Sequence, residues 1–142
     1  MRPQTSIVSS CVACASIILL AGVLLVSPVR AINACAFQFS SQNLCATLAW
    51  PPSTSVGAEV KFQLQFHDQA SGAARDPAGD VGLFLWMPMM GHGSRPVTIG
   101  HSSGSGLYDV SEAYFVMTGD WDLHLTLRNG ATSEESIVTV HF

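Results

Sequence analysis

Two stretches of strict alternation between apolar and polar residues constrain the fold of this chain more than any other feature. The first covers residues 60–66 and the second covers residues 121–127, and in each of them every second residue is apolar. A period of two places all the apolar side chains on one face of a β-strand. Each stretch therefore predicts a strand with one face in a hydrophobic core and the other face in solvent.

Weaker patterns predict further strands. An alternating run over residues 44–50 ends at a Pro-Pro pair, and the continuous apolar run over residues 81–87 predicts a strand covered on both faces. Two more strands are expected over residues 107–117 and 136–142. Seven or eight strands at this spacing indicate an all-β fold, an antiparallel immunoglobulin-like β-sandwich.

Turn-forming residues separate these strands. Residues 68–79 are rich in Ala, Gly, Asp and Pro, and residues 101–106 are rich in Gly and Ser, so both segments predict loops. Residues 118–120 predict a tight turn, and Asn129-Gly130 is a hairpin turn signal.

The first 31 residues have the layout of a secretory signal peptide. Arg2 supplies a positive start, the apolar run is densest over residues 12–26, and Ala31 is a small residue at the expected cleavage position. We expect cleavage after Ala31. The alternative is an uncleaved anchor, because residues 7–26 form a 20-residue stretch that is long enough to cross a bilayer.

Removing residues 1–31 leaves 111 residues with four basic and ten acidic side chains, a net charge of −6. Recognition of phosphate needs clustered Lys and Arg, so this balance excludes nucleic acid and anionic lipid as partners. We expect a periplasmic or secreted domain. If the N-terminal segment is retained, the chain is instead anchored in the inner membrane with its domain in the periplasm.

Two cysteines, Cys35 and Cys45, follow the N-terminal segment. In an exported chain such a pair most simply forms a disulfide. A metal–thiolate pair is the alternative, although neither cysteine has a neighbouring His or Met. We therefore divide the remaining chain into an N-terminal extension at 32–54, which holds the disulfide, and a β-sandwich domain at 55–142.

Three methionines and a histidine fall within six residues, in the segment Met87-Pro88-Met89-Met90-Gly91-His92-Gly93. Its Pro and Gly residues are poor strand formers, so the segment is expected at a strand end and in the loop beyond it. Thioether sulfur is a soft ligand and imidazole nitrogen a borderline one, and together they favour copper, Cu(I) in particular. The segment therefore predicts a copper site.

Spacing indicates which of these side chains act together. On an extended chain Met87 and Met89 face the same side and Met90 faces the other, so we expect two of the three methionines to act with His92. His101, on the following loop, is the next candidate ligand.

Ordinary packing is the alternative interpretation of this segment, because methionine is a common core residue and its sulfur packs well on aromatic rings. Trp86 and Trp121 are expected to pack in the core or to shield the site from water. His124 alternates with the apolar residues of its strand, so we expect it on the surface.

The chain resembles the YtkA-like and FixH-like domains, which are bacterial extracytoplasmic β-sandwiches. The resemblance covers roughly residues 55–142, and its most specific parts are residues 87–93, 106–110 and 117–123. It implies an immunoglobulin-like fold and an association with copper handling or oxidase assembly. The site residues that it implies are Met87, Met89, Met90 and His92, with Met117 contributing from a neighbouring hairpin.

Catalysis has little support, because the Gly-x-Ser-x-Gly match at residues 100–104 lies in a Gly- and Ser-rich loop with no helical pattern after it, and no isolated Cys lies near a His. We expect no enzyme. The first hypothesis is an exported copper-binding module for storage, buffering or delivery to a copper-accepting or membrane-complex protein. The alternative is an immunoglobulin-like structural or protein-interaction domain that binds no metal. A third hypothesis is an accessory domain of a membrane complex, held there by an uncleaved N-terminus.

Overall fold

A computed structural model of the chain describes residues 35–142. The expected signal peptide and its alternative, an uncleaved anchor, lie outside the described residues. Within residues 35–142, no helix is both long and apolar enough to cross a membrane.

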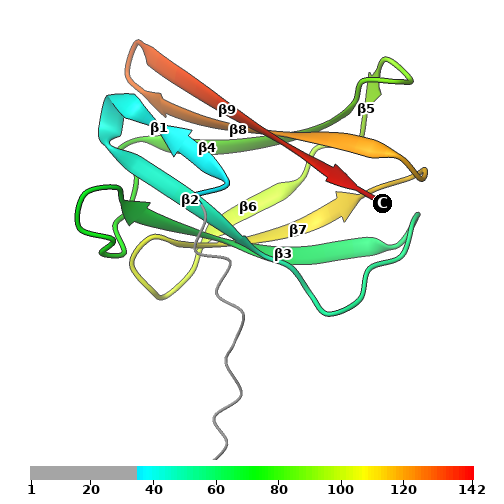
Figure 1. The fold of residues 1–142 in the computed structure, drawn as a ribbon, viewed down its shortest axis with the longest axis horizontal. Helices are drawn as coiled ribbons and strands as arrows, with labels where there is room; N and C mark the ends of the chain where they lie inside the picture. Colours follow the sequence, from blue (N-terminus) through cyan, green and yellow to red (C-terminus); the bar gives the residue numbers. More distant parts are fainter. Residues whose placement is uncertain (1–34) are drawn as a thin grey trace, which may run out of the picture. The chain divides into compact units, whose positions relative to one another are not determined.

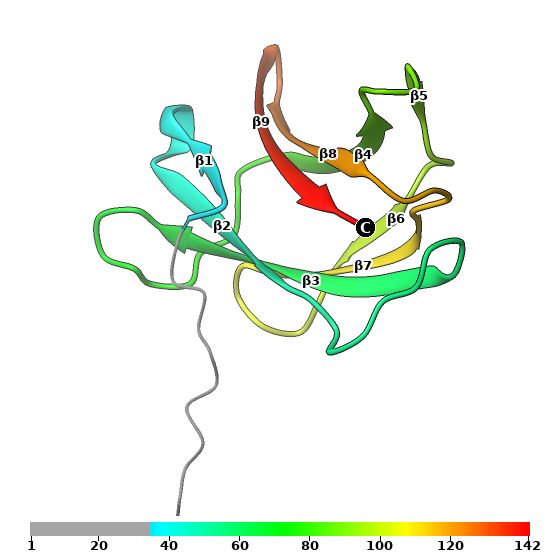
Figure 2. The ribbon, with the colours of Figure 1, turned by 45° about the vertical axis from the view of Figure 1, so that its right-hand side comes forward.

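The described residues form two antiparallel sheets that pack face to face (Figures 1 and 2). Sheet A contains β1 (Phe37–Phe39), β2 (Leu44–Ala49), β3 (Glu59–Asp68), β6 (Thr98–His101) and β7 (Leu107–Tyr114). Sheet B contains β4 (Asp80–Met87), β5 (His92–Gly93), β8 (Asp120–Asn129) and β9 (Thr132–His141). A short 3₁₀ turn, η1 (Ser40–Gln42), joins β1 to β2.

The strand order identifies the fold class. Sheet A has the order β1-β2-β3-β7-β6 and sheet B the order β5-β4-β8-β9. Without the short strands β1 and β5, these are the four-stranded and three-stranded sheets of an immunoglobulin-like sandwich, with the chain crossing between sheets in the same sequence. The predicted fold class is confirmed. The described residues hold nine strands where seven or eight were expected, because β1 and β5 are too short to show a periodic pattern.

The core lies between the inner faces of the two sheets. In β3, Val60, Phe62, Leu64 and Phe66 are buried, and in β8, Trp121 and the three leucines that alternate with it are buried. Both alternating stretches therefore form the strands that the sequence predicts, with the predicted face inward.

Other boundaries differ from the predictions. β7 ends at Tyr114, three residues earlier than expected, and β9 begins at Thr132, four residues earlier. β4 was expected to be covered on both faces, and this prediction is wrong, because Phe84 is 47% exposed. No layer of residues 35–142 covers the outer face of sheet B (Figure 2).

The Cys35–Cys45 disulfide is confirmed, with a Cα–Cα distance of 5.3 Å. It joins the start of β1 to β2, so residues that we assigned to an N-terminal extension form part of sheet A. The backbone N–H of Gln38 in β1 also donates to the Ser136 hydroxyl of β9, at 3.1 Å. This end of sheet A therefore lies beside the edge of sheet B.

Glu134 of β9 fixes the same junction. Its carboxylate accepts hydrogen bonds from the backbone N–H groups of Ser40 and Ser41, at 2.8 and 3.1 Å, and from both serine hydroxyls. The Ser41 hydroxyl is the largest cause that lowers the pKa of Glu134 below its ordinary value. The charged form of Glu134 thus ties η1 to sheet B.

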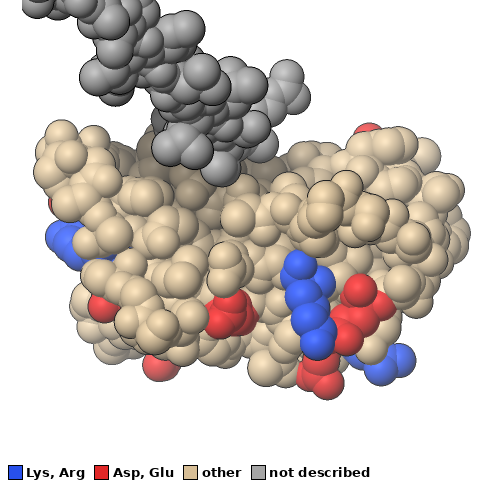
Figure 3. Space-filling model, turned by 90° about the horizontal axis from the view of Figure 1, so that it is seen from below, with Lys and Arg blue, Asp and Glu red and all other residues tan. Residues whose placement is uncertain are grey.

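The side of the molecule formed by sheet A presents few charges among uncharged residues (Figure 3). Along β3 the outward side chains include Glu59, Lys61 and Gln63. Lys61 pairs with Glu59 at 3.8 Å, and the Gln63 amide donates to Asp109 at 2.8 Å.

Candidate functional site

The methionine–histidine segment forms the turn from β4 to β5. The Gly91 N–H donates to the carbonyl of Met87 at 3.0 Å, and Gly91 has a φ of +65°, a conformation that glycine adopts without strain. The chain therefore turns directly after Met87 instead of continuing extended. Met87 is 4% exposed, whereas Met89 is 83% and Met90 57% exposed. The expectation that Met87 and Met89 face the same side is wrong for this reason.

Met87 and His92 are direct partners in the register of β4 and β5. Residues opposite each other in an antiparallel pair project from the same face, so the thioether and the imidazole lie side by side. The His92 ring lies edge-on to the buried ring of Trp121, with the two centroids 6.3 Å apart. Of the three methionines in the segment, Met87 alone lies at this inner position.

Two residues of the β7–β8 loop complete the surroundings. A Cβ atom built on Gly119 would lie 2.8 Å from the Met87 methyl, so the absence of a side chain there makes room for the thioether. The indole N–H of Trp121 donates to the carbonyl of Met117 at 3.0 Å, and Met117 packs against the core. The structure thus places Met87 beside His92 at one end of the sandwich, where Trp121 contacts the His92 ring and the backbone carbonyl of Met117.

His92 has a defined orientation. Its Nδ1 lies 3.3 Å from the Gly93 carbonyl oxygen. In the tautomer with the proton on Nδ1, this nitrogen donates to the carbonyl and Nε2 keeps its lone pair. That is the arrangement in which an imidazole can act as a ligand.

His101 has a different environment. It ends β6 in sheet A, where its Nε2 lies 2.8 Å from an Asp76 oxygen and its ring lies edge-on to Tyr108. The N–H of Gly106 is the largest cause that lowers the pKa of Asp76, and His101 is the next. The His101 side chain is therefore engaged with Asp76 and Tyr108 in sheet A, and the structure does not bring it together with the Met87–His92 pair.

In the part of the chain that the structure describes, no three side chains of His, Cys, Asp or Glu are placed to hold a metal ion together. A metal at the Met87–His92 pair would depend on thioether sulfur and a single imidazole. This donor set fits Cu(I) and does not fit Mg²⁺ or Ca²⁺, which take oxygen ligands.

A second feature, the outer face of sheet B, was missed by the sequence analysis. We use this name for the outward residues of β4, β8 and β9. Phe84, His124 and Ile137 form one row across the three strands, and Trp86 lies next to Phe84 with a centroid distance of 5.9 Å. Phe84 and Ile137 are about half exposed, at 47% and 50%.

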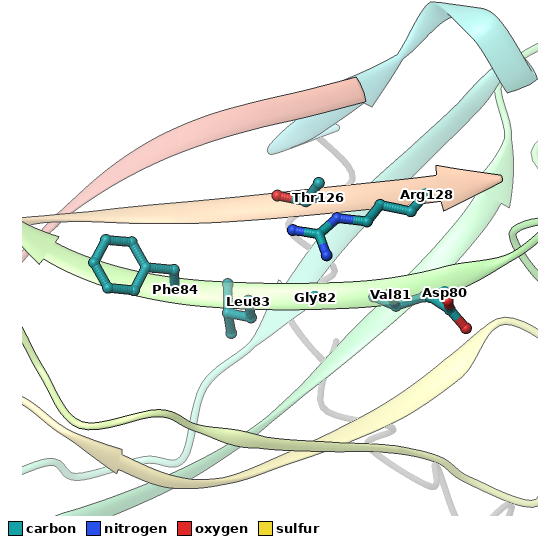
Figure 4. A pocket seen from close by; sticks show the side chains of 7 residues that line it. All are labelled: Asp80, Val81, Gly82, Leu83, Phe84, Thr126 and Arg128. Carbon is teal, nitrogen blue, oxygen red and sulfur yellow. The ribbon is translucent and has the colours of Figure 1, made fainter. Parts of the chain in front are cut away.

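Small residues shape the surface around Phe84. A Cβ atom on Gly93 would lie 2.7 Å from the Phe84 ring, so glycine lets this ring lie over β5. On the other side, Gly82 leaves open space beside Phe84. Figure 4 shows the resulting hollow, with the Arg128 side chain extending along β8 toward Thr126. The spacing of Asp80, Gly82 and Phe84 on one face was the signal that this strand has an uncovered side.

His124 lies on the outer face, as expected, but it is more covered than a typical surface residue. Its ring lies 5.9 Å from the Phe84 ring, and its Nδ1 lies 3.2 Å from Glu135. Its Nε2 is buried with no hydrogen-bond partner among the described residues. Trp121 is fully buried in the core, as expected, whereas Trp86 lies on the outer face.

Carboxylates surround the apolar row of this face. The acidic residues on the outer face of sheet B are Asp80, Asp120, Asp122 and Glu135. Asp120 lies 2.7 Å from His141, and Asp122 accepts a hydrogen bond from the Thr139 hydroxyl at 2.6 Å.

Comparisons with known proteins find one similar solved structure. No family model matches the sequence, and a search of curated proteins finds no match. Among solved structures, the chain is similar to the crystal structure of the Lin-41 filamin domain, at 20% identity and a TM-score of 0.41, over 63% of this chain and 89% of that one. The fold class rests on the strand order described above.

Proposed function

We propose that this protein is an exported, immunoglobulin-like interaction domain that binds another protein through the outer face of sheet B. The observation that carries the proposal is the exposure of Phe84 and Ile137 on either side of the His124 ring, with Trp86 beside Phe84. Contiguous exposed apolar side chains mark interaction surfaces, and aromatic residues contribute most of the energy in such interfaces. The disulfide supports export, since disulfides persist in oxidising compartments.

The platform under these side chains also supports binding. β8 lies between β4 and β9, and the pairing of the three strands is unbroken from the row of Asp80 to the row of Trp86. A surface held by two continuous ladders loses little conformational freedom when a partner binds. Preorganisation of this kind favours a specific partner over general adhesion.

A photo-crosslinking amino acid placed at Phe84 tests the proposal, with Gln63 on the outer face of sheet A as the matched control position. The full chain is expressed with its own N-terminal segment, the protein captured at position 84 is identified, and it is then purified. We expect Phe84→Ser to weaken its affinity at least about tenfold, as for an interface hot spot, and Gln63→Ser to leave it unchanged. Equal crosslinking at both positions, or equal affinity of both variants, would contradict the proposal.

A second candidate function is copper binding, and the Met87–His92 pair is the observation that favours it. We propose that Met87 and His92, with Met117 nearby, hold Cu(I) at the end of the sandwich, and that Trp121 shields it from water. Met89 and Met90 lie on the solvent side of the turn, where they would meet a copper donor or acceptor first. A role in copper storage, buffering or delivery is what the resemblance of residues 87–93 to YtkA-like and FixH-like domains would imply.

Titration with Cu(I) under reducing conditions, against a chromophoric Cu(I) chelator, tests the copper site. We expect one equivalent to bind, and we expect Met87→Leu and His92→Ala each to weaken binding at least about tenfold. His101→Ala is the control and should bind normally. Leucine replaces methionine with little change in volume, so the first variant stays folded. If the wild-type protein binds no Cu(I), the copper proposal fails and the interaction proposal is unaffected.

A further inference from the structure

The outer face of sheet B carries charge as well as apolar surface. Its four acidic residues face a single Arg, Arg128, so with neutral histidines its formal charge is −3. The acids are arranged around the apolar side chains: Asp122 lies opposite Trp86, Asp120 lies beyond it, and Glu135 and Asp80 lie on the Gly82 side. A binding partner must therefore cover aromatic rings and negative charge at the same time.

Asp122 is the one of these four carboxylates that lies opposite an aromatic residue in the register of β4 and β8. Asp120 and Glu135 already have a histidine beside them, whereas Asp122 forms no ion pair within residues 35–142. Asp122 lies directly opposite Trp86, so the indole and a carboxylate without an ion pair lie side by side on this face. A guanidinium or ammonium group satisfies both, because cations are attracted to aromatic faces and to carboxylates.

On this basis, and resting on the proposed interaction function, we infer that the partner presents a cationic segment to this face. An Arg or Lys side chain lies between Trp86 and Asp122, and its aliphatic part covers Phe84. The chain already contains one contact of this kind, since the Arg95 guanidinium lies 4.7 Å from the centre of the Tyr114 ring.

Charge also selects against other occupants. A second copy of the chain, docked by the same face, would bring two surfaces of formal charge −3 together, and opposed like charges disfavour an interface. Anionic polymers are repelled for the same reason. The cationic partner is the occupant that complements both the charge and the apolar surface.

Two short peptides provide the probe. Each has twelve residues; one repeats Gly-Arg-Ser four times and the other repeats Gly-Glu-Ser four times. Amide NMR spectra of the ¹⁵N-labelled protein, expressed from the full sequence, locate the binding. We expect the Arg peptide to shift amide signals of β4, β8 and β9, with an affinity that falls as salt is added. The Glu peptide should shift none of them.

Matched variants distinguish binding at the outer face of sheet B from non-specific attraction between opposite charges. Asp122→Asn should lower the affinity for the Arg peptide about fivefold, which is the effect of losing one exposed charge pair. Asp109→Asn removes an exposed carboxylate from the outer face of sheet A and should change nothing. The inference is overturned if the two variants lower the affinity for the Arg peptide equally, or if the Glu peptide binds as tightly as the Arg peptide.

The protein captured by crosslinking at Phe84 distinguishes the two proposals. If Phe84→Ser weakens its binding and Asp122→Asn does not, the interaction function stands and the cationic partner is wrong. If both variants weaken it and Asp109→Asn does not, both proposals hold. If neither variant has an effect, the interaction function fails as well.

Discussion

The two sheets have similar inner faces and different outer faces. Along β3, the outer face of sheet A presents Glu59, Lys61 and Gln63, whereas the outer face of sheet B presents Phe84 and Trp86 on β4. Polar outward residues are what a half-buried strand requires for solubility, and β3 follows that rule. β4 breaks it with two aromatic residues. The inner pattern specifies the fold, and the outer pattern of sheet B is the one on which the proposed interaction function rests.

The largest predicted effects concern the inner faces, where the two sheets should behave alike. Leu64 of β3 and Leu123 of β8 are both fully buried. Replacing either leucine with alanine should lower the free energy of unfolding by about 3 kcal/mol, because each change leaves a cavity in a shared core. Denaturant unfolding, followed by tryptophan fluorescence, measures both values. A difference of more than about 3 kcal/mol between them, which exceeds the spread in the cost of such truncations, would mean that the sheets do not contribute equally to one core.

The next effect should fall on sheet A. The Cys35–Cys45 disulfide closes a loop with a sequence separation of 10 residues. Replacing both cysteines with serine should lower the free energy of unfolding by about 2–3 kcal/mol, from the restored freedom of the unfolded chain. Binding of the Arg peptide to sheet B should not change at temperatures where the variant is folded. Loss of that binding in the folded variant would show that the two outer faces are not independent.

A smaller effect is expected where the two sheets meet. The pKa of Glu134 is lowered in the folded state, so its contribution to stability is present above about pH 4.5 and is lost as the pH falls through the folded-state pKa. Glu134→Gln should cost about 1 kcal/mol at pH 7 and should flatten the loss of stability in acid. Glu135→Gln, one residue along and on the outer face, is the control for the charge change. If the free energy of unfolding depends on pH in the same way in both variants, the hydrogen bonds of Glu134 do not hold the two sheets together.

The smallest effects concern the outer faces themselves. Phe84→Ser should lower the free energy of unfolding by less than about 1 kcal/mol, because the ring is already half exposed, and Gln63→Ser by less than about 0.5 kcal/mol. Thermal unfolding of the two variants under one set of conditions gives the comparison. If Phe84→Ser destabilises the protein by about 3 kcal/mol, as truncation of a buried phenylalanine does, the ring serves folding. The exposure of Phe84 would then no longer support an interaction function for the outer face of sheet B.

The sequence predicted those parts of the fold that depend on local periodicity. Alternation located β3 and β8 with the correct inward face, and it placed His124 on the outside. The Asn129-Gly130 turn predicted a hairpin, but pairing with β8 extends β9 back through the polar residues 132–135, where no apolar pattern marks a strand. Strand length there depends on the partner strand and not on the residues themselves.

The candidate sites were harder to predict, because both depend on contacts between distant segments. An apolar run such as residues 81–87 does not reveal whether another layer covers its second face, and so the exposure of Phe84 was missed. The pairing of Met87 with His92 depends on where the chain turns, and the turn at Gly91 separates Met87 from Met89. Composition located the methionine–histidine segment, but only the backbone path shows which side chains lie together.

The tie between Glu134 and the serines of η1 has a consequence for how the chain reaches its native state. It joins residues 94 positions apart in sequence, and the bond from Gln38 to Ser136 spans 98. Contacts of such long range form late and slow the folding of β-sandwiches, because the intervening chain must be ordered first. Until β9 is in place, β1 and η1 lack their hydrogen bonds to Ser136 and Glu134, and β8 has an open edge that can pair with another chain. The period before β9 docks is therefore the time at which this protein is most exposed to aggregation.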